Sequence, residues 1–580
     1  MWYLPLIENR LTEEQKNRLK SIYYPTVVGT QPEDSRRGFC VTKDGEIRHY
    51  GRRGKTGAFD EESGTVCYVA SRDGGMTWEP HDAPHGALGA AFYDETRGRY
   101  VTVFNRQSGE DRGTFAYLSE DGYDDTAYRR VKIADEIYYD MFQPKCLASG
   151  RYIVTMQKNF EGRHVLAVAL SDDGGEHWRI HDFPDTISFE IEYPNIDPRW
   201  ENNYSESVVT EVSPGHLYLL VRTSRDCFYE FTSDDNGDTW SEGRPSPFYG
   251  TLTTPFFLTL SDGRTILFWN NTYPLPEPCH ANELPPHAEG FTYGGENAFT
   301  NRDVSHAAVT DDFKNWTGLR ELYLNPVRNR SDFRTYGGMV SSADKSVHQF
   351  QAIELPFGKV LVAVGQHEAV RKLIIFDPAH LCETSRKEDF QNGLVNLTTH
   401  LYVKSLSGSY VGKGLNGHCH WNRTDGALLL PDPSMNGREV LQIGRTHDER
   451  LVNEKQGAVW NFPNAKKGCV TVELQIEGAG IAVCLCDRWF NACDDTAWDK
   501  AVFAFRVTPD LVVPHRAVTL TVAYDVDAGR AEVFTDGKKR FFVRLKNPPP
   551  FGVSYLHLMT LAETSDFSGT LIRSLAFEAR

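Results

Sequence analysis

The sequence contains no run of about 18 apolar residues, the length that a membrane-spanning helix requires. Its first ten residues, MWYLPLIENR, also lack the basic segment and apolar stretch of a secretory leader. We therefore expect no membrane partner and a cytoplasmic location, or a secreted one if a leader has been removed.

Cysteine pairs are also missing. The 11 cysteines are odd in number and scattered, and none forms a Cys-x-x-Cys motif. This pattern favours the reduced thiols of a cytosolic protein over a disulfide framework.

Positive charge is in deficit. The chain has 62 Lys and Arg residues and 79 Asp and Glu residues, which gives a net charge of −17. Such a balance argues against nucleic acid as a partner. It still permits an acidic sugar as a ligand, because a local cluster of Arg can hold a carboxylate. Neither a phosphate-binding glycine loop nor a nucleophile elbow occurs.

The chain does have length, aromatics and glycine. Its 580 residues are more than a domain with one hydrophobic core usually has, which predicts at least two domains. Aromatic residues make up 12% of the chain, and there are 48 Gly. Together they are typical of many short strands that are joined by turns.

One eight-residue phrase recurs along the first half of the chain. Ser71–Trp78, Ser171–Trp178 and Ser233–Trp240 all follow the pattern Ser-x-Asp-x-Gly-x-Thr/His-Trp, and looser versions occupy Ser119–Tyr123 and Thr310–Trp316. The Ser hydroxyl and Asp carboxylate can accept backbone N–H bonds within a tight turn, where Gly supplies a positive φ. A repeat of roughly 50 residues with this turn predicts four-stranded propeller blades.

The phrase resembles the Asp-box of the sialidase (neuraminidase) superfamily, whose members are six-bladed or seven-bladed β-propellers. The resemblance implies an all-β fold, and we expect six blades here, the sixth without an Asp-box. The first two strands of the six blades are expected at 38–50, 87–105, 144–158, 207–223, 255–271 and 347–366.

The predicted organisation has four parts. Residues 1–30 form an N-terminal helical segment, in which Thr12 and Gln15 match a capping box. Residues 31–380 form the catalytic propeller, and residues 381–400 form a linker. Residues 401–580 keep alternating β patterns without an Asp-box, which predicts a β-sandwich of jelly-roll or lectin-like type.

In a propeller of this type the Asp-boxes lie at one rim, and a sugar site at the other rim would gather the starts of first strands and the ends of second strands. We predict catalytic roles for Glu206, Asp303, Tyr336, His306 and His348. Substrate-binding roles are predicted for Arg36, Arg37, His85, Gln143, Arg222, Trp269, Asn270, Arg302, Arg334 and Gln366.

The resemblance also implies roles for some of these residues. Glu206 matches the Glu that assists a Tyr nucleophile, and Arg222 matches one of three Arg that hold the sugar carboxylate. Arg36 or Arg37 would be the first of the three. Two features depart from the family: Arg37 is followed by Gly-Phe instead of Ile-Pro, and the first strand of the sixth blade, VHQFQA from Val347, has no Tyr. The sugar specificity is therefore left open.

We expect an exo-acting glycoside hydrolase that releases a terminal acidic or deoxy sugar from an oligosaccharide at the propeller axis. One alternative is a polysaccharide lyase that acts on a uronic-acid glycan with a His or Tyr base. The other is a glycan-binding protein without turnover.

No cofactor is expected. Zinc is not favoured at Cys279, His280 and His287 or around His418-Cys419-His420, because neither group has a second ligand pair. Oxygen ligands for Ca²⁺ could come from Asp487, Asp494 and Asp495, but a solvated turn is the favoured interpretation of these residues.

Overall fold

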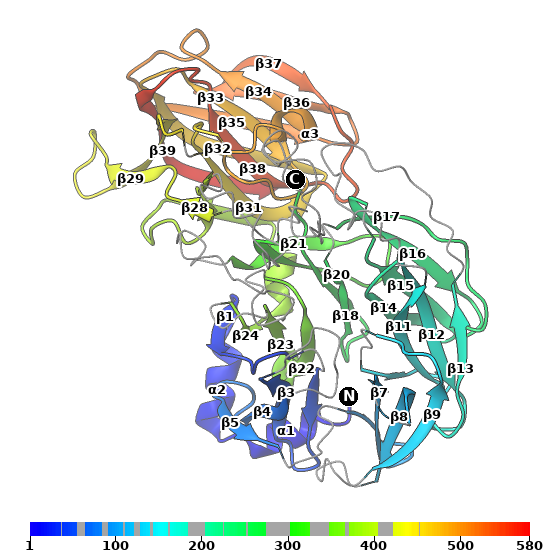
Figure 1. Cartoon of the computed structure of the whole chain (residues 1–580). Helices are drawn as coiled ribbons and strands as arrows, with labels where there is room; N and C mark the ends of the chain where they lie inside the picture. Colours follow the sequence, from blue (N-terminus) through cyan, green and yellow to red (C-terminus); the bar gives the residue numbers. More distant parts are fainter. Residues whose placement is uncertain are drawn as a thin grey trace.

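Six four-stranded antiparallel sheets form a ring in the N-terminal part of the chain (Figure 1). The computed structural model describes residues 1–35, 38–54, 64–83, 91–107, 109, 111–120, 128–139, 143–160, 163–183, 204–223, 225–250, 253–273, 302–324, 347–365, 370–403, 422–449, 451 and 453–580. The predicted fold class, a six-bladed β-propeller followed by a β-sandwich, is confirmed.

Each of the first five blades takes four consecutive strands. The first blade contains β2 (Phe39–Val41), β3 (Ile47–Arg53), β4 (Thr65–Ser71) and β5 (Glu79–Asp82), and the second contains β6 (Phe92–Asp94), β7 (Arg99–Arg106), β8 (Gly113–Ser119) and β9 (Arg129–Ala134). The third contains β10 (Lys145–Cys146), β11 (Tyr152–Phe160), β12 (Arg163–Ser171) and β13 (Arg179–Asp182), and the fourth contains β14 (Ser207–Ser213), β15 (His216–Val221), β16 (Cys227–Ser233) and β17 (Arg244–Tyr249). The fifth contains β18 (Phe256–Thr259), β19 (Thr265–Trp269), β20 (Val304–Thr310) and β21 (Thr317–Leu324).

The sixth blade closes the ring with a strand from the other end of the chain. It consists of β22 (Gln351–Leu355), β23 (Lys359–Val364), β24 (Lys372–Phe376) and the N-terminal β1 (Thr26–Gly29), and Thr26 pairs with Ile375. No turn joins its third strand to its fourth, which explains why this blade has no Asp-box. The sequence analysis placed β1 in the helical segment, because four half-exposed residues give no readable alternation.

Two helices precede β1: α1 (Leu4–Arg10) and α2 (Glu13–Ser21). The capping box predicted for the second is present, since Gln15 N donates to Thr12 Oγ1 (3.2 Å) and Thr12 N donates to Gln15 Oε1 (2.9 Å). Short helical turns follow at η3 (Pro356–Gly358), η4 (Pro378–Cys382) and α3 (Ala497–Lys500). No helix in the described part of the chain is long and apolar enough to cross a membrane.

The Asp-boxes clasp the turns between third and fourth strands. In the third copy Gly237 N donates to Ser233 Oγ (2.8 Å), and both the N–H and the hydroxyl of Thr239 donate to Asp235 (2.9 and 2.6 Å). Trp240 Nε1 donates to the Gly237 carbonyl (3.0 Å). The copies at Ser71 and Ser171 repeat these bonds. Each box therefore satisfies its own turn internally.

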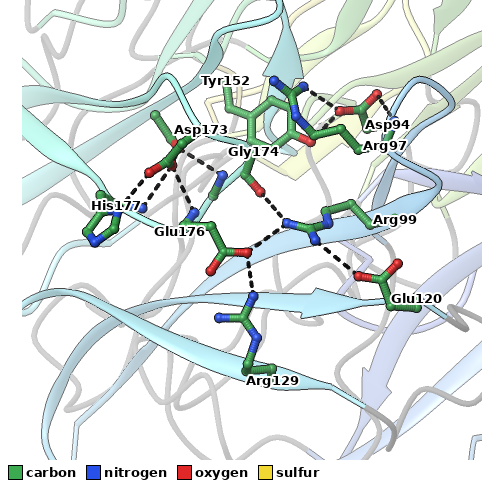
Figure 2. A network of polar contacts seen from close by, with 12 residues as sticks. Asp94, Arg97, Arg99, Glu120, Arg129, Tyr152, Asp173, Gly174, Glu176 and His177 are labelled. Carbon is green, nitrogen blue, oxygen red and sulfur yellow. Dashed lines mark hydrogen bonds and ion pairs between the residues drawn. The ribbon is translucent and has the colours of Figure 1, made fainter.

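Ion pairs join neighbouring blades at the Asp-box rim (Figure 2). Arg99 of the second blade donates to Glu176 (2.9 Å) and to the Gly174 carbonyl (3.1 Å) in the Asp-box turn of the third blade. Arg129 also pairs with Glu176 (2.5 Å). Apolar clusters fill the space between blades, such as the one that shares Phe257 and Trp269 with Phe248 and Val208. The propeller core is thus a set of inter-blade layers.

The second group of strands forms two packed sheets. One sheet contains β25 (Ser385–Glu388), β29 (Leu428–Pro431), β30 (Glu439–Arg445), β32 (Lys467–Ile476), β35 (Val518–Asp525), β36 (Arg530–Thr535), β37 (Lys538–Arg544) and β39 (Asp566–Ala579). The other contains β26 (Leu397–Thr398), β31 (Gly457–Ala465), β33 (Ile481–Cys486), β34 (Phe503–Val507) and β38 (Val553–Thr560), and β27 (Leu401–Val403) pairs separately with β28 (Asn422–Thr424). Strands β25 and β26 come from residues 381–400, which the sequence analysis treated as a linker.

We predict that the replacement Asp235→Ala destabilises the propeller by about 1–3 kcal/mol, because it removes the acceptor of two Thr239 donors. Calorimetry should show a lower unfolding midpoint. The control is Asp234→Ala, whose side chain is 85% exposed and pairs with His216 at the surface. Equal shifts in the two variants would contradict the clasp role of Asp235.

The Asp-box carboxylates should also set the acid stability. Hydrogen bonds from the Thr239 hydroxyl and then the Thr239 N–H lower the pKa of Asp235 to about 2. Since this pKa lies below the usual value of about 4, the stabilisation is complete above about pH 4 and is lost as the pH falls towards 2. We expect Asp235→Asn to make the unfolding midpoint fall less steeply between pH 4 and pH 2.

Candidate functional site

The strand register of the fourth blade separates its Asp-box from the predicted site. Ser207 pairs with Val221 at one end of β14 and β15, whereas Leu217 pairs with Ser233 of the Asp-box at the other end. Glu206 precedes Ser207 and Arg222 follows Val221. Both therefore lie at the rim that is opposite the Asp-boxes.

Glu206 and Arg222 face each other across this strand pair. Arg222 N donates to the Glu206 carbonyl (2.9 Å), and Ser205 N donates to the Arg222 carbonyl (3.0 Å), so the ladder continues one step beyond the strands. This pairing puts the two side chains on one face of the sheet. Arg222 Nη1 forms an ion pair with Glu206 Oε2, and both side chains are largely buried.

Three blades hold the Glu206 carboxylate. Besides Arg222, Thr254 of the fifth blade donates its hydroxyl to Oε2 (2.7 Å), and Gln349 of the sixth donates Nε2 to Oε1 (3.0 Å). Gln349 has a φ of 63°, a left-handed conformation that costs roughly 1–2 kcal/mol for a residue with a side chain. Strain of this kind gathers at functional sites.

Arg222 has hydrogen-bonding capacity beyond this ion pair. Its Nε is buried and has no hydrogen-bond partner among the residues that the structure describes. A buried donor of this kind normally finds an acceptor. A ligand carboxylate or hydroxyl would supply one.

A second polar pair lies between the fifth and sixth blades. Arg302, directly before β20, is fully buried, and its Nη1 lies 3.1 Å from His348 Nε2. Since a guanidinium can only donate, Nε2 accepts, and His348 is a neutral imidazole with its proton on Nδ1. Asp303 is the next residue after Arg302 and is 1% exposed. The structure thus places Asp303 on the blade adjacent to Glu206 and Arg222.

Gln143 and Gly38 meet closer to the axis. Gln143 Nε2 donates to the Phe39 carbonyl (3.3 Å). Gly38 has a φ of 82°, and a Cβ there would lie 3.1 Å from Oε1 of Gln351 and 3.2 Å from Oε1 of Gln143. First-strand starts of the first, third and sixth blades therefore converge.

A channel continues from this end along the axis. It is a cavity of about 620 Å³ that is lined by the first strand of every blade, together with Gln143 and Met1–Tyr3. Lys145 lies in this wall and donates to the Val209 carbonyl (2.8 Å), and burial lowers its pKa to about 8. The polar groups near Gln143 form one end of the channel.

Two predicted site residues, Trp269 and Asn270, make structural contacts within the propeller. Trp269 is 1% exposed and packs on Phe248 with 5.8 Å between ring centroids, so neither face is open to a sugar. Asn270 Nδ2 donates to the carbonyls of Val304 (2.6 Å) and Val347 (2.9 Å). Asn270 therefore holds the segments that carry Arg302 and His348.

His306 lies where the propeller meets the second domain. It accepts a hydrogen bond from Asn271 N at Nδ1 (3.0 Å) and lies 2.5 Å from the Tyr555 hydroxyl at Nε2. Burial lowers its pKa to about 3. We therefore leave His306 out of the proposed catalytic group.

Six predicted site residues lie outside the described residues: Arg36, Arg37, His85, Arg334, Tyr336 and Gln366. Conversely, Gln349 and Gln351 were not chosen from the sequence. Both lie at the start of the first strand of the sixth blade, and His348 was selected because of that position. An amide side chain has no charge or acid–base chemistry that would have marked either residue as functional.

The possible metal ligands have other contacts. Asp487 accepts a hydrogen bond from the Tyr249 hydroxyl (3.0 Å), and Asp494 accepts from the N–H and hydroxyl of Thr496 (3.0 and 2.6 Å). Within the described ranges, no group of three His, Cys, Asp or Glu is arranged to hold a metal ion. The segments around Cys279 and His418 lie outside those ranges.

Comparison with solved structures finds a sialidase of Trypanosoma rangeli in complex with 2,3-difluorosialic acid (11% identity, TM-score 0.38, 96% of both chains). It also finds a Dyadobacter fermentans protein of unknown function (16% identity, TM-score 0.38, 61% of this chain and 95% of that one). At these identities and TM-scores neither likeness carries an argument.

Two sequence comparisons are more informative. An anhydrosialidase from Macrobdella decora is 28% identical over 113 residues, which are 20% of this chain and 13% of that protein. The chain thus matches only a small part of this relative. The family described as a BNR repeat-like domain matches residues 93–348, the greater part of the propeller. This part of the chain therefore contains a BNR repeat-like domain, and with its Asp-boxes and six blades the chain is similar to the sialidase superfamily of β-propellers.

Proposed function

We propose that the protein is an exo-acting glycoside hydrolase that releases a terminal acidic or deoxy sugar from an oligosaccharide at the propeller axis. The observation that carries this proposal is the carboxylate of Glu206, which Arg222, Thr254 and Gln349 hold from three blades at the rim opposite the Asp-boxes. A sugar site needs such a fixed carboxylate beside cationic and amide donors.

Each group has a role in the proposed reaction. Asp303 protonates the leaving glycosidic oxygen, and Glu206, directly or through Tyr336, activates the nucleophile. Arg222, with Arg302 nearby on the next blade, binds the carboxylate or hydroxyls of the terminal sugar. A site at the mouth of a central channel suits a chain end, hence exo action.

A lyase that acts on a uronic-acid glycan is the second candidate, and the Arg302–His348 pair favours it. A lyase needs a cation to neutralise the uronate carboxylate and a base to take the proton next to it. His348 Nε2, once released from Arg302, would be that base. New absorbance from an unsaturated uronate would distinguish this reaction from hydrolysis.

The first prediction from this proposal concerns Glu206. We expect Glu206→Gln to lower kcat by about 10²–10⁴-fold, because the amide cannot accept a proton or activate a nucleophile. Sugar release is measured on oligosaccharides that end in sialic acid, uronic acid, rhamnose or arabinose.

Glu230→Gln is the matched control for this experiment. Glu230 is a buried Glu of the same blade that accepts bonds from Tyr218 (2.5 Å) and Arg244 (2.6 Å), away from Glu206. A variant at Glu206 that is as active as the Glu230 variant would show that the site lies elsewhere. Binding of a glycan without turnover by the unmodified protein would instead support a lectin.

The second prediction concerns the charge of the sugar. Arg222→Lys keeps a positive charge beside Glu206 but loses the planar donor fork. We expect KM to rise about tenfold for a substrate that ends in a carboxylate-bearing sugar, and less for a neutral one. Arg244→Lys, at an exposed partner of Glu230, is the control. Equal changes for acidic and neutral sugars would argue that Arg222 does not bind the carboxylate.

A further inference from the structure

The second domain is hydrogen-bonded to the residues after β19, one of the two inner strands of the fifth blade. Asn271 Nδ2 donates to the Asp487 carbonyl (2.9 Å), and Trp489 N donates to the Asn271 carbonyl (2.9 Å). Tyr273 N then donates to the Trp489 carbonyl (2.8 Å). The loop after β33 therefore extends the backbone pairing of a propeller strand.

A hydrogen-bond chain crosses the same boundary. Asn271 N donates to His306 Nδ1, so the neutral imidazole carries its proton on Nε2 and donates it to the Tyr555 hydroxyl. The Tyr555 hydroxyl donates in turn to Glu321 Oε1 (2.9 Å). Tyr555 belongs to β38 of the second domain and is fully buried. Each donor and acceptor in this chain has one consistent direction.

This hydrogen-bond chain starts at Asn271, one residue after Asn270, which contacts the segments that carry the proposed site. Asn270 precedes Asn271, and its amide holds the carbonyls of Val304 and Val347. Val347 N donates to the Arg302 carbonyl (2.8 Å). These bonds tie the end of β19 to the residues before β20 and β22.

A second anchor holds the fourth blade at the same rim. Arg488 of the second domain pairs with Asp226 (2.7 Å), four residues after Arg222. Its guanidinium carbon lies 3.6 Å from the centroid of the Tyr249 ring, which is a favourable cation–π geometry. The two anchors thus hold the two blades that carry Glu206, Arg222 and Arg302.

We propose that the second domain is part of the functional site, and that Tyr555 is a positioning residue which acts through His306 and Asn271 on the segments bearing Arg302 and His348. The inference rests on the proposed function only where activity is the readout. Loss of a buried hydroxyl would leave His306 and Glu321 without this bond, and a shift of site groups by about 1 Å can cost 10²-fold in rate.

The test compares Tyr555→Phe with Tyr524→Phe in the full chain. Tyr524 is a buried Tyr of the same domain, and its hydroxyl has no hydrogen-bond partner in the part of the chain that the structure describes. Hydrogen exchange is measured for peptides that cover 269–273 and 347–351. We expect faster exchange in Tyr555→Phe alone, because the amides of Asn271 and Val347 belong to the affected network.

Activity gives the second readout. We expect kcat to fall about tenfold in Tyr555→Phe with a smaller change in KM, and to stay unchanged in Tyr524→Phe. Glu321→Gln keeps an acceptor for the Tyr555 hydroxyl and should retain most of the activity. If Tyr555→Phe does not fold, Asp226→Asn tests the other anchor, with faster exchange expected over 222–227.

Unchanged exchange at the site segments would overturn the proposal, whatever the activity. Faster exchange with unchanged kcat in an active protein would overturn it too, since the segments would then be loosened without consequence. Faster exchange in a protein that cleaves none of the glycans would support the link between the domains and count against the proposed function alone.

Discussion

A ring of sheets has to close, and here the closing contact is the antiparallel pairing of β1 with β24. An unclosed propeller would leave β24 as an open edge and the apolar faces of the first and sixth blades without a neighbour. The cluster that fills this junction takes Leu361 and Ile375 from the sixth blade and Ile47 and Phe39 from the first. Because the ring is closed, the first strands surround one axis, and groups from five blades can reach one place.

The sequence predicts the fold well because the Asp-box is a local structure. Ser233, Asp235 and Thr239 satisfy each other within one turn, so the eight residues alone specify the geometry. The position of Glu206 and Arg222 at the opposite rim was predictable for a related reason, since register counted from the Asp-box fixes which rim a residue occupies. Ring closure by β1 was not predictable, because pairing between the two ends of the propeller leaves no local pattern.

The site was harder to predict than the fold, because position along a strand does not reveal what a side chain packs against. Trp269 and His306 stand at the correct rim, yet the former belongs to an inter-blade core and the latter to the boundary with the second domain. Gln349 shows the opposite case: it contacts Glu206, although an isolated amide carries no chemical signature. Long-range packing decides such cases, and it depends on residues hundreds of positions away.

The boundary between propeller and sandwich also limits how the chain can be divided. Arg320 of β21 is 2% exposed and pairs with Glu383 (2.8 Å), and Asn461 of β31 accepts from its Nε (3.1 Å). Phe551 of the second domain packs against the apolar cluster that contains Trp316 and Leu319. A propeller truncated before β25 would keep Glu383 but lose Asn461, and it would expose the apolar cluster against which Phe551 packs, so we expect recombinant fragments cut there to aggregate. Swapping this sandwich onto a foreign propeller would lose the same contacts.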